Sequence, residues 1–229
     1  TGAFLLTATG ASAPRSHAGL TTSVGARLRG STAYCLDGQV YTAASAVRWL
    51  VDLGLLDRPD SVDAAAEGAG DDLLFVPALA GLAAPWWRSD ATATFAGLTL
   101  ATSRADVVAA VLRGVAATVV DLLDVVASDL GSPVTRLRVD GGLTRSRTLM
   151  QAQADLAQVP VDVYPYADAT ALGAASAAAV GLDPSRDPAD VVGGWKPAAT
   201  YEPQWSPDRA ADHLGRWRAA VARSLEATS

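Results

Sequence analysis

The spacing of hydrophobic residues changes from strand-like to helix-like within the first quarter of the chain. Apolar runs separated by turn-forming residues occupy residues 3–9, 20–28 and 32–40, and they predict the three strands of a meander. Apolar residues then recur three or four positions apart over residues 42–55, which predicts a helix. Residues 58–72 are acidic and rich in Ala and Gly, and they predict a loop with one short helix.

A capping pattern marks the start of the longest predicted helix. Ser103 and Asp106 stand just before an apolar stretch that runs to about Leu130 and stops at Gly131. Strand and helix patterns then alternate over residues 134–139, 147–157, 161–164 and 169–180.

The C-terminal part divides into an irregular segment and a final helix. Residues 183–206 are rich in Pro, Gly and Asp and predict a surface excursion, whereas residues 207–226 predict a terminal helix. No composition shift or linker divides the chain, so one domain over residues 1–229 is expected.

This order of elements predicts an α/β fold of the ribonuclease H-like kind, as found in a lobe of actin-like ATPases. A three-strand meander is followed by βαβα units with right-handed crossovers, and helices are expected on both faces of a mixed sheet.

Composition narrows the function classes. The net charge of −6 argues against a nucleic-acid surface, so phosphate recognition would rest on backbone amides and a few Arg residues. The single cysteine, Cys35, permits no internal disulfide and is expected to be a buried thiol. No apolar run reaches the roughly twenty residues of a membrane span, and the start is not signal-like, so a cytoplasmic location is expected. His17 and His213 lack partners at a spacing typical of a triad or a metal site, so no metal ligands are expected.

A strand that ends in Asp140-Gly141-Gly142 and leads toward a helix is the strongest local pattern for chemistry. Backbone N–H groups at a helix N-terminus suit a phosphate or nucleotide, because the helix dipole favours negative charge there. Glycines at this point leave room for a ligand against the backbone. A glycine-rich turn with no ligand remains the alternative.

Several segments in the same order and spacing resemble one family. They are residues 1–6, 75–82, 84–90, 97–99, 139–146 and 169–175. Together they resemble the C-terminal half of glycerol kinases, in the FGGY carbohydrate-kinase family of actin/Hsp70/hexokinase-like ATPases. The resemblance implies an enzyme that uses ATP and Mg²⁺ to phosphorylate a small polyol or sugar.

The resemblance also implies what lies outside this chain. Members of the family are roughly twice as long as this chain. An N-terminal lobe that carries a phosphate loop would therefore be the partner of the lobe formed by this chain. The catalytic Asp would lie upstream of Thr1, so no catalytic residue is expected here. Formation of homo-oligomers stays open.

Binding roles follow from the resemblance residue by residue. Thr1 and Gly2 would contact nucleotide phosphates, and Phe4 would form an apolar wall of the substrate pocket; a fraying terminus and a core Phe are the alternative. Ala44 and Arg48 stand where the family has a Gly and a Gln that face the nucleotide, and Arg48 is either a phosphate ligand or a solvated helix residue.

The glycine turn carries the remaining nucleotide positions. Gly141 and Gly142 match the family's nucleotide-binding pair, and Ser146 replaces the usual Asn near the adenine. Ser cannot reproduce the paired hydrogen bonds of an amide, so relaxed base selectivity is expected. Asp140 either caps the turn or has a role linked to metal or phosphate.

A further segment resembles a loop between the family's lobes. Arg88 and Asp90 match it, but the basic residue that usually follows is absent. The neighbouring Trp86-Trp87 pair is expected to pack on the core or loop and not to stack on a ligand.

Two alternatives to a glycerol kinase remain open from sequence. One is a pentulose or other sugar kinase of the same family, against which the Thr1 to Phe4 motif favours glycerol. The other is a non-catalytic nucleotide-binding homologue, which the departures at Ala44, Arg48 and Ser146 motivate.

Overall fold

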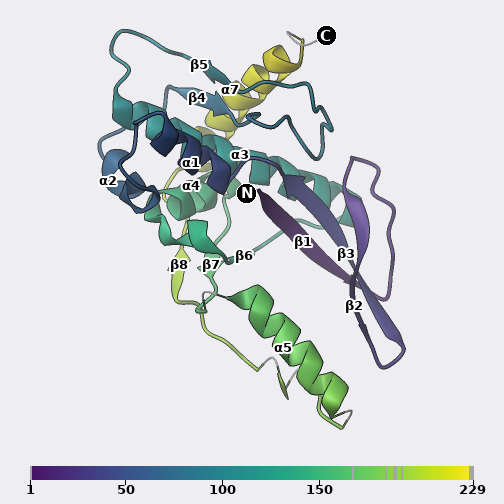
Figure 1. Ribbon diagram of the computed structural model, residues 1–229. Coiled ribbons are helices and arrows are strands. Elements are labelled where there is room, and N and C mark those ends of the chain that lie inside the picture. Colours follow the sequence, from purple (N-terminus) through teal and green to yellow (C-terminus); the bar gives the residue numbers. More distant parts are fainter. Residues whose placement is uncertain (1, 167, 184, 188–189, 192, 227–229) are drawn as a thin grey trace.

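Three small sheets and the long helix α3 organise the chain (Figure 1). The computed structural model describes residues 2–166, 168–183, 185–187, 190–191 and 193–226. The strands are β1 (Ala3–Gly10), β2 (Thr21–Leu28), β3 (Ser31–Val40), β4 (Leu74–Val76), β5 (Thr94–Ala96), β6 (Leu137–Val139), β7 (Val161–Val163) and β8 (Ala199–Tyr201). The helices are α1 (Ala44–Asp52), η1 (Pro59–Ser61), α2 (Val62–Ala65), α3 (Arg104–Leu130), η2 (Gly142–Arg145), α4 (Arg147–Ala157), α5 (Ala169–Leu182) and α7 (Pro207–Glu226), where η denotes 3₁₀.

The first sheet has the order β1-β3-β2, so the simple meander expected from sequence is wrong in its strand order. The hairpin from β2 to β3 turns at Arg29 and Gly30, both with positive φ, which suits a tight antiparallel connection. β1 also pairs antiparallel with β3, so β1 and β2 run in the same direction. Parallel strands cannot be joined by a tight turn, and residues 11–20 provide the longer connection.

The second half contains the predicted alternation of strands and helices. β6 and β7 pair in parallel, with α4 between them in sequence, and β8 pairs antiparallel with β7. β8 lies within residues 183–206, so part of the expected surface excursion is a sheet strand.

The expected single mixed sheet is divided in the part of the chain that the structure describes. β1 and β6 belong to different sheets, and residues of both strands line a cavity. A ladder of hydrogen bonds needs strands about 4.8 Å apart, and no such ladder joins these two strands.

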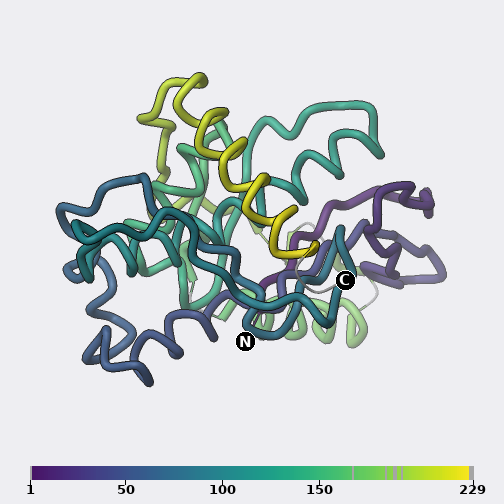
Figure 2. The backbone as a smooth tube through the Cα atoms, turned by 90° about the horizontal axis from the view of Figure 1, so that it is seen from above, coloured from purple at the N-terminus to yellow at the C-terminus, as the bar shows by residue number. Residues whose placement is uncertain are grey.

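Helix α3 runs through the core and has well-formed ends. Ser103 and Asp106 form a capping box at its start, and Gly131 ends it with φ 66°. At Gly114 the helix approaches β4 so closely that a Cβ would lie 2.2 Å from the carbonyl oxygen of Phe75. The buried Trp217 of α7 donates its indole N–H to that same carbonyl at 2.8 Å. Figure 2 shows α7, in yellow, crossing the body of the molecule.

Helix α5 projects from the rest of the molecule (Figure 1). It is rich in Ala, a strong helix former, yet among its described residues only Val180 is buried. No helix in the described ranges is long and apolar enough to cross a membrane.

Candidate functional site

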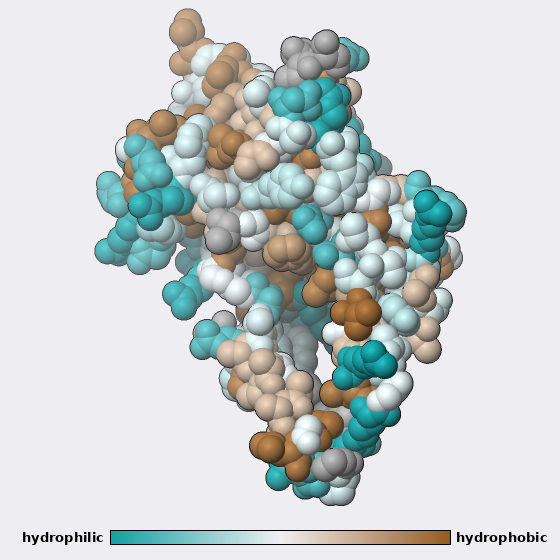
Figure 3. Space-filling model, turned by 45° about the vertical axis from the view of Figure 1, so that its right-hand side comes forward, coloured by the Kyte–Doolittle hydropathy of each residue, from teal (hydrophilic) through white to brown (hydrophobic). Residues whose placement is uncertain are grey.

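A cavity of about 1890 Å³ lies between the first sheet, α1, α3 and the β6–α4 connection. Figure 3 shows the molecule hollowed between two projecting arms, which correspond to α5 and the β1–β3 sheet in Figure 1. The cavity is large enough for a nucleotide, since ligand pockets typically occupy roughly 300–1,000 Å³.

Residues from three distant parts of the sequence meet at this cavity. All of the expected binding residues that are described line it: Gly2, Phe4, Ala44, Arg48, Gly141, Gly142 and Ser146. Thr1 lies outside the described residues.

The start of β1 forms one wall. Gly2 lies against the backbone of β3's end, where a Cβ would come within 2.0 Å of the carbonyl oxygen of Val40, so this position requires glycine for packing. Phe4 has 68% of its surface exposed, so it is not a core residue and offers an apolar face to the cavity.

Helix α1 forms a second wall through its first turns. Ala44 is the first residue of α1, one turn before Arg48. Arg48 is exposed and its Nε donates to the Oδ1 of Asp52 at 3.0 Å, one helical turn further on. The guanidinium therefore has an exposed partner that offsets part of its charge, and this contact fits the solvated-helix alternative.

The glycine turn forms the third wall. Gly141 has φ 92°, a conformation that side chains disfavour. An added Cβ at Gly142 would meet nothing within 4 Å. The backbone at Gly142 is thus open to a ligand.

The helix after this turn does not begin at the glycines. Residues Gly142–Arg145 form the 3₁₀ helix η2, and α4 starts only at Arg147, with Ser146 as its N-cap. The helix predicted over residues 147–157 is confirmed as α4, and the 3₁₀ turn η2 separates the Gly pair from its N-terminus.

The N-terminus of α4 already holds a carboxylate, that of Asp63 from α2. Its Oδ2 accepts from the backbone N–H of Arg147 at 2.9 Å, and its Oδ1 accepts from the N–H of Thr148 at 3.1 Å. The Ser146 hydroxyl donates to the same Oδ1 at 2.7 Å and accepts from the Leu149 N–H at 3.1 Å. The first amides of this helix, which the pattern offered to a phosphate or nucleotide, thus already donate to a carboxylate of the chain itself.

These contacts also set the charge of Asp63. Burial acts to raise the pKa of its carboxyl group, but the hydrogen bonds from Ser146, Arg147 and Thr148 outweigh burial and lower the pKa. Sequence reasoning missed Asp63 because it lies in the acidic segment read as a loop, 83 residues before Ser146. A local sequence pattern cannot predict a contact between residues so far apart in the chain.

The Trp86-Trp87 segment packs on the protein, as expected. Trp86 meets the buried Trp217 edge-on, with ring centroids 6.1 Å apart, and Trp87 donates its indole N–H to the Gly19 carbonyl at 2.7 Å. Arg88 forms two hydrogen bonds of 2.8 Å with Asp90 and holds the pKa of that carboxyl at about 2.

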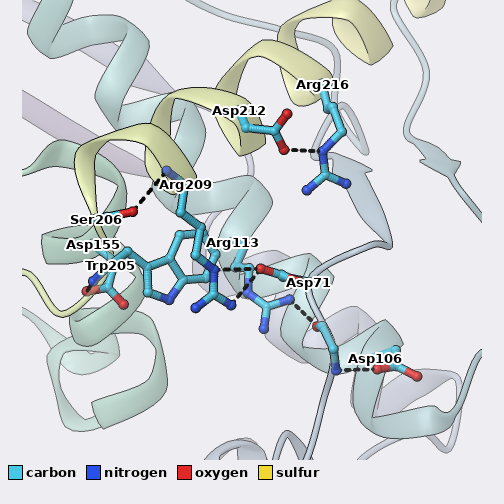
Figure 4. Close-up of polar contacts among 10 residues, drawn as sticks. Asp71, Asp106, Arg113, Asp155, Trp205, Ser206, Arg209, Asp212 and Arg216 are labelled. Carbon is cyan, nitrogen blue, oxygen red and sulfur yellow. Dashed lines mark hydrogen bonds and ion pairs between the residues drawn. The ribbon is translucent and has the colours of Figure 1, made fainter.

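A second polar cluster joins α3, α7 and the segment before β4 (Figure 4). Arg209 lies 4.0 Å from the ring centroid of Trp205 and forms an ion pair with Asp71 at 2.6 Å. Arg113 donates to the Gly70 carbonyl, and burial lowers its pKa. None of these residues lines the cavity. The cluster instead holds α3, α7 and the segment before β4 together.

Across the described ranges, no three His, Cys, Asp or Glu side chains gather where they could hold a metal ion.

Comparison with known proteins identifies the family of this chain. The family model described as "FGGY family of carbohydrate kinases, C-terminal domain" matches residues 1–182. The chain belongs to the FGGY family of carbohydrate kinases. The resemblance inferred from the motifs is confirmed.

Curated relatives of this FGGY domain include glycerol kinases. That of Myxococcus xanthus is 39% identical over 98% of the chain, and that of Mycolicibacterium gilvum is 39% identical over 99%. The chain covers 46% of each of these relatives, and so spans about half their length.

Solved FGGY structures share the fold. The Plasmodium falciparum glycerol kinase with ADP matches with a TM-score of 0.86 and 31% identity, over 98% of this chain and 46% of that one. A xylulose kinase from Rhodospirillum rubrum matches with a TM-score of 0.80 and 25% identity, over 98% and 46%. The actin-like ATPase fold predicted from sequence is confirmed.

Proposed function

We propose that the full-length protein is an ATP-dependent glycerol kinase, to which this chain contributes the nucleotide-binding side of the active site. The observation that carries the proposal is the meeting of the expected binding positions around one cavity, in a chain whose curated relatives include glycerol kinases. Those relatives favour glycerol over a pentulose as the acceptor.

The residues of the cavity fit a nucleotide. Gly142 leaves open space beside its backbone, which a nucleotide could occupy. When bound, ATP supplies the phosphoryl group that is transferred to a hydroxyl of the acceptor. The glycine turn would contact the nucleotide through its backbone, and the exposed ring of Phe4 would exclude water beside the acceptor's carbon atoms.

Mg²⁺ and the catalytic base are assigned no residue of this chain. No three His, Cys, Asp or Glu side chains gather among the described residues, and the resemblance places the base outside this chain. The expected location is the cytoplasm, and the expected partners are a nucleotide, a small polyol and an N-terminal lobe.

A coupled assay that measures ADP formation tests the proposal. The full-length protein should consume ATP when glycerol is added, and xylulose and gluconate at the same concentration should support much slower turnover. Equal or faster turnover with a sugar would assign a different acceptor, and turnover with none of them would favour a non-catalytic nucleotide-binding role.

A further inference from the structure

We propose that Asp63 is a positioning residue for the nucleotide: it fixes the glycine turn against the cavity through Ser146 and the first amides of α4. This inference rests on the proposed function, because it assumes that the nucleotide contacts the turn formed by Gly141 and Gly142. Asp63 belongs to none of the segments that resemble the family.

The contact between Asp63 and α4 is built to hold a fixed geometry. A carboxylate has about four positions at which it can accept a hydrogen bond. Three are taken by donors from consecutive residues, Ser146, Arg147 and Thr148, at 2.7–3.1 Å. With these positions occupied, the carboxylate has little capacity left for a ligand, so its role is to orient other groups.

Asp63 is itself anchored to the core. The residue before it, Val62, is only 4% exposed and packs in the hydrophobic core. The short helix α2 that carries both residues contacts α3 and α4. Asp63 therefore holds the N-terminus of α4 in a fixed position relative to the core.

Ser146 connects this anchor to the glycine turn. Ser146 is both the C-cap of η2 and the N-cap of α4. Its backbone N–H donates to the Leu143 carbonyl at 3.0 Å. A movement of Ser146 would shift η2 and with it Gly142, whose open side faces the cavity. Displacement of a binding group by about 1 Å can cost up to 10²-fold in rate or affinity.

The carboxylate also sets which part of a nucleotide can lie at α4. Its negative charge offsets the positive end of the helix and occupies the first amides, so a phosphate there would meet repulsion. The uncharged base and ribose are compatible with this end of the cavity, and the phosphates should lie farther from α4.

The test compares two carboxylates that both accept hydrogen bonds at a helix N-terminus. Asp63→Asn removes the negative charge of the proposed anchor and the oxygen that accepts from the Arg147 N–H. Asp106→Asn makes the same change in a carboxylate that accepts from Ser103 and Gly70 at the start of α3, away from the cavity. Steady-state kinetics with ATP and glycerol, together with the midpoint of thermal unfolding, are measured on the full-length protein. Both variants should lose thermal stability, but only Asp63→Asn should raise the KM for ATP, by about tenfold, with little change in the KM for glycerol.

A second variant checks the route of the effect. Ser146→Ala should raise the KM for ATP in the same direction, and the double variant should be no worse than Asp63→Asn alone, because both substitutions break one connection. If Asp63→Asn does not fold, an unchanged KM in Ser146→Ala is enough to overturn the proposal.

The remaining outcomes separate this inference from the proposed function. Turnover by the wild-type protein with an unchanged KM in Asp63→Asn would overturn the positioning role alone. A lower KM for ATP in Asp63→Asn would mean that Asp63 only repels phosphate, and would also overturn it. Absence of ATP-dependent turnover in both wild type and Asp106→Asn would contradict the proposed function itself.

Discussion

Gly142 is the residue at which the nucleotide site can be altered with least effect on the fold. A Cβ there meets no atom within 4 Å, and its backbone lacks the positive φ that makes Gly141 strained by substitution. Gly142→Val should therefore lower nucleotide affinity by about tenfold or more, roughly 1.4 kcal/mol, because the branched side chain occupies ligand space. Isothermal calorimetry with ATP on the full-length protein measures this change.

Gly194→Val is the matched control for that experiment. Gly194 also has open space around its Cβ position, has no positive φ, and lies outside the cavity. It should bind ATP like the wild type. Unchanged affinity in Gly142→Val would remove this residue from the nucleotide site.

Ser146 bears on the choice of nucleotide. Its hydroxyl donates to Asp63 and accepts from the Leu149 N–H, so it has little capacity to read a base edge. Sites without paired hydrogen bonds discriminate weakly, so ATP and GTP should compete with dissociation constants within about tenfold of each other. A strong preference for ATP over GTP would show that another group reads the base.

His213 links the stability of the protein to pH. It is 1% exposed, and its Nδ1 has no hydrogen-bond partner among the described residues. Burial, with smaller contributions from the positive Arg113 and Arg216, lowers its pKa from 6.5 to about 4.

The sign of the pH effect follows from this lowered pKa. Between pH 6.5 and 4 the unfolded chain binds a proton at His213 that the folded chain does not, so stability is lost as pH falls. The loss should reach about 3 kcal/mol near pH 4, at roughly 1.4 kcal/mol per pKa unit. Urea unfolding at pH 7 and pH 5 should show the slope, and His213→Gln should flatten it; an equal slope in both proteins would assign the effect to other groups.

At the scale of elements, the close approach of α3 to β4 reverses the usual effect of replacing a helical glycine. A Cβ at Gly114 would lie 2.2 Å from the backbone oxygen of Phe75, which cannot move without disturbing β4 and its bond to Trp217. Gly114→Ala should destabilise the protein by about 1–3 kcal/mol despite the higher helix propensity of Ala.

The same substitution in α7 is the control. Gly215 is exposed, and a Cβ there meets nothing within 4 Å. Gly215→Ala should stabilise by up to about 1 kcal/mol. Chemical denaturation measures both changes, and two changes of the same sign would contradict the close approach.

At the scale of the whole molecule, the cavity represents only part of the proposed enzyme. The chain spans about half the length of its curated relatives, and the resemblance places the catalytic Asp outside it. The 229-residue chain alone should therefore show no glycerol-dependent ATP turnover, whereas the full-length protein should. The coupled assay for ADP formation is run on the chain and on the full-length protein. Turnover by the chain alone would require a catalytic residue within it.

Local patterns in the sequence predicted most of the helices and strands and the glycine turn, whereas the other expected binding positions came from the resemblance to the family. The capping box of α3, its end at Gly131 and the helix over Arg147–Ala157 follow from neighbouring residues, because capping and helical periodicity act over one or two turns. The glycine turn was recognisable for the same reason.

Tertiary structure alone decided which elements meet. The central place of β3, the pairing of β8 with β7 and the contact of Asp63 with α4 all join residues far apart in sequence. Periodicity states which face of an element is buried, but a hydrogen bond or strand pairing depends on which other element reaches that face. For this reason the glycine turn could be predicted from the sequence, whereas the carboxylate that occupies the neighbouring helix N-terminus became apparent only in the fold.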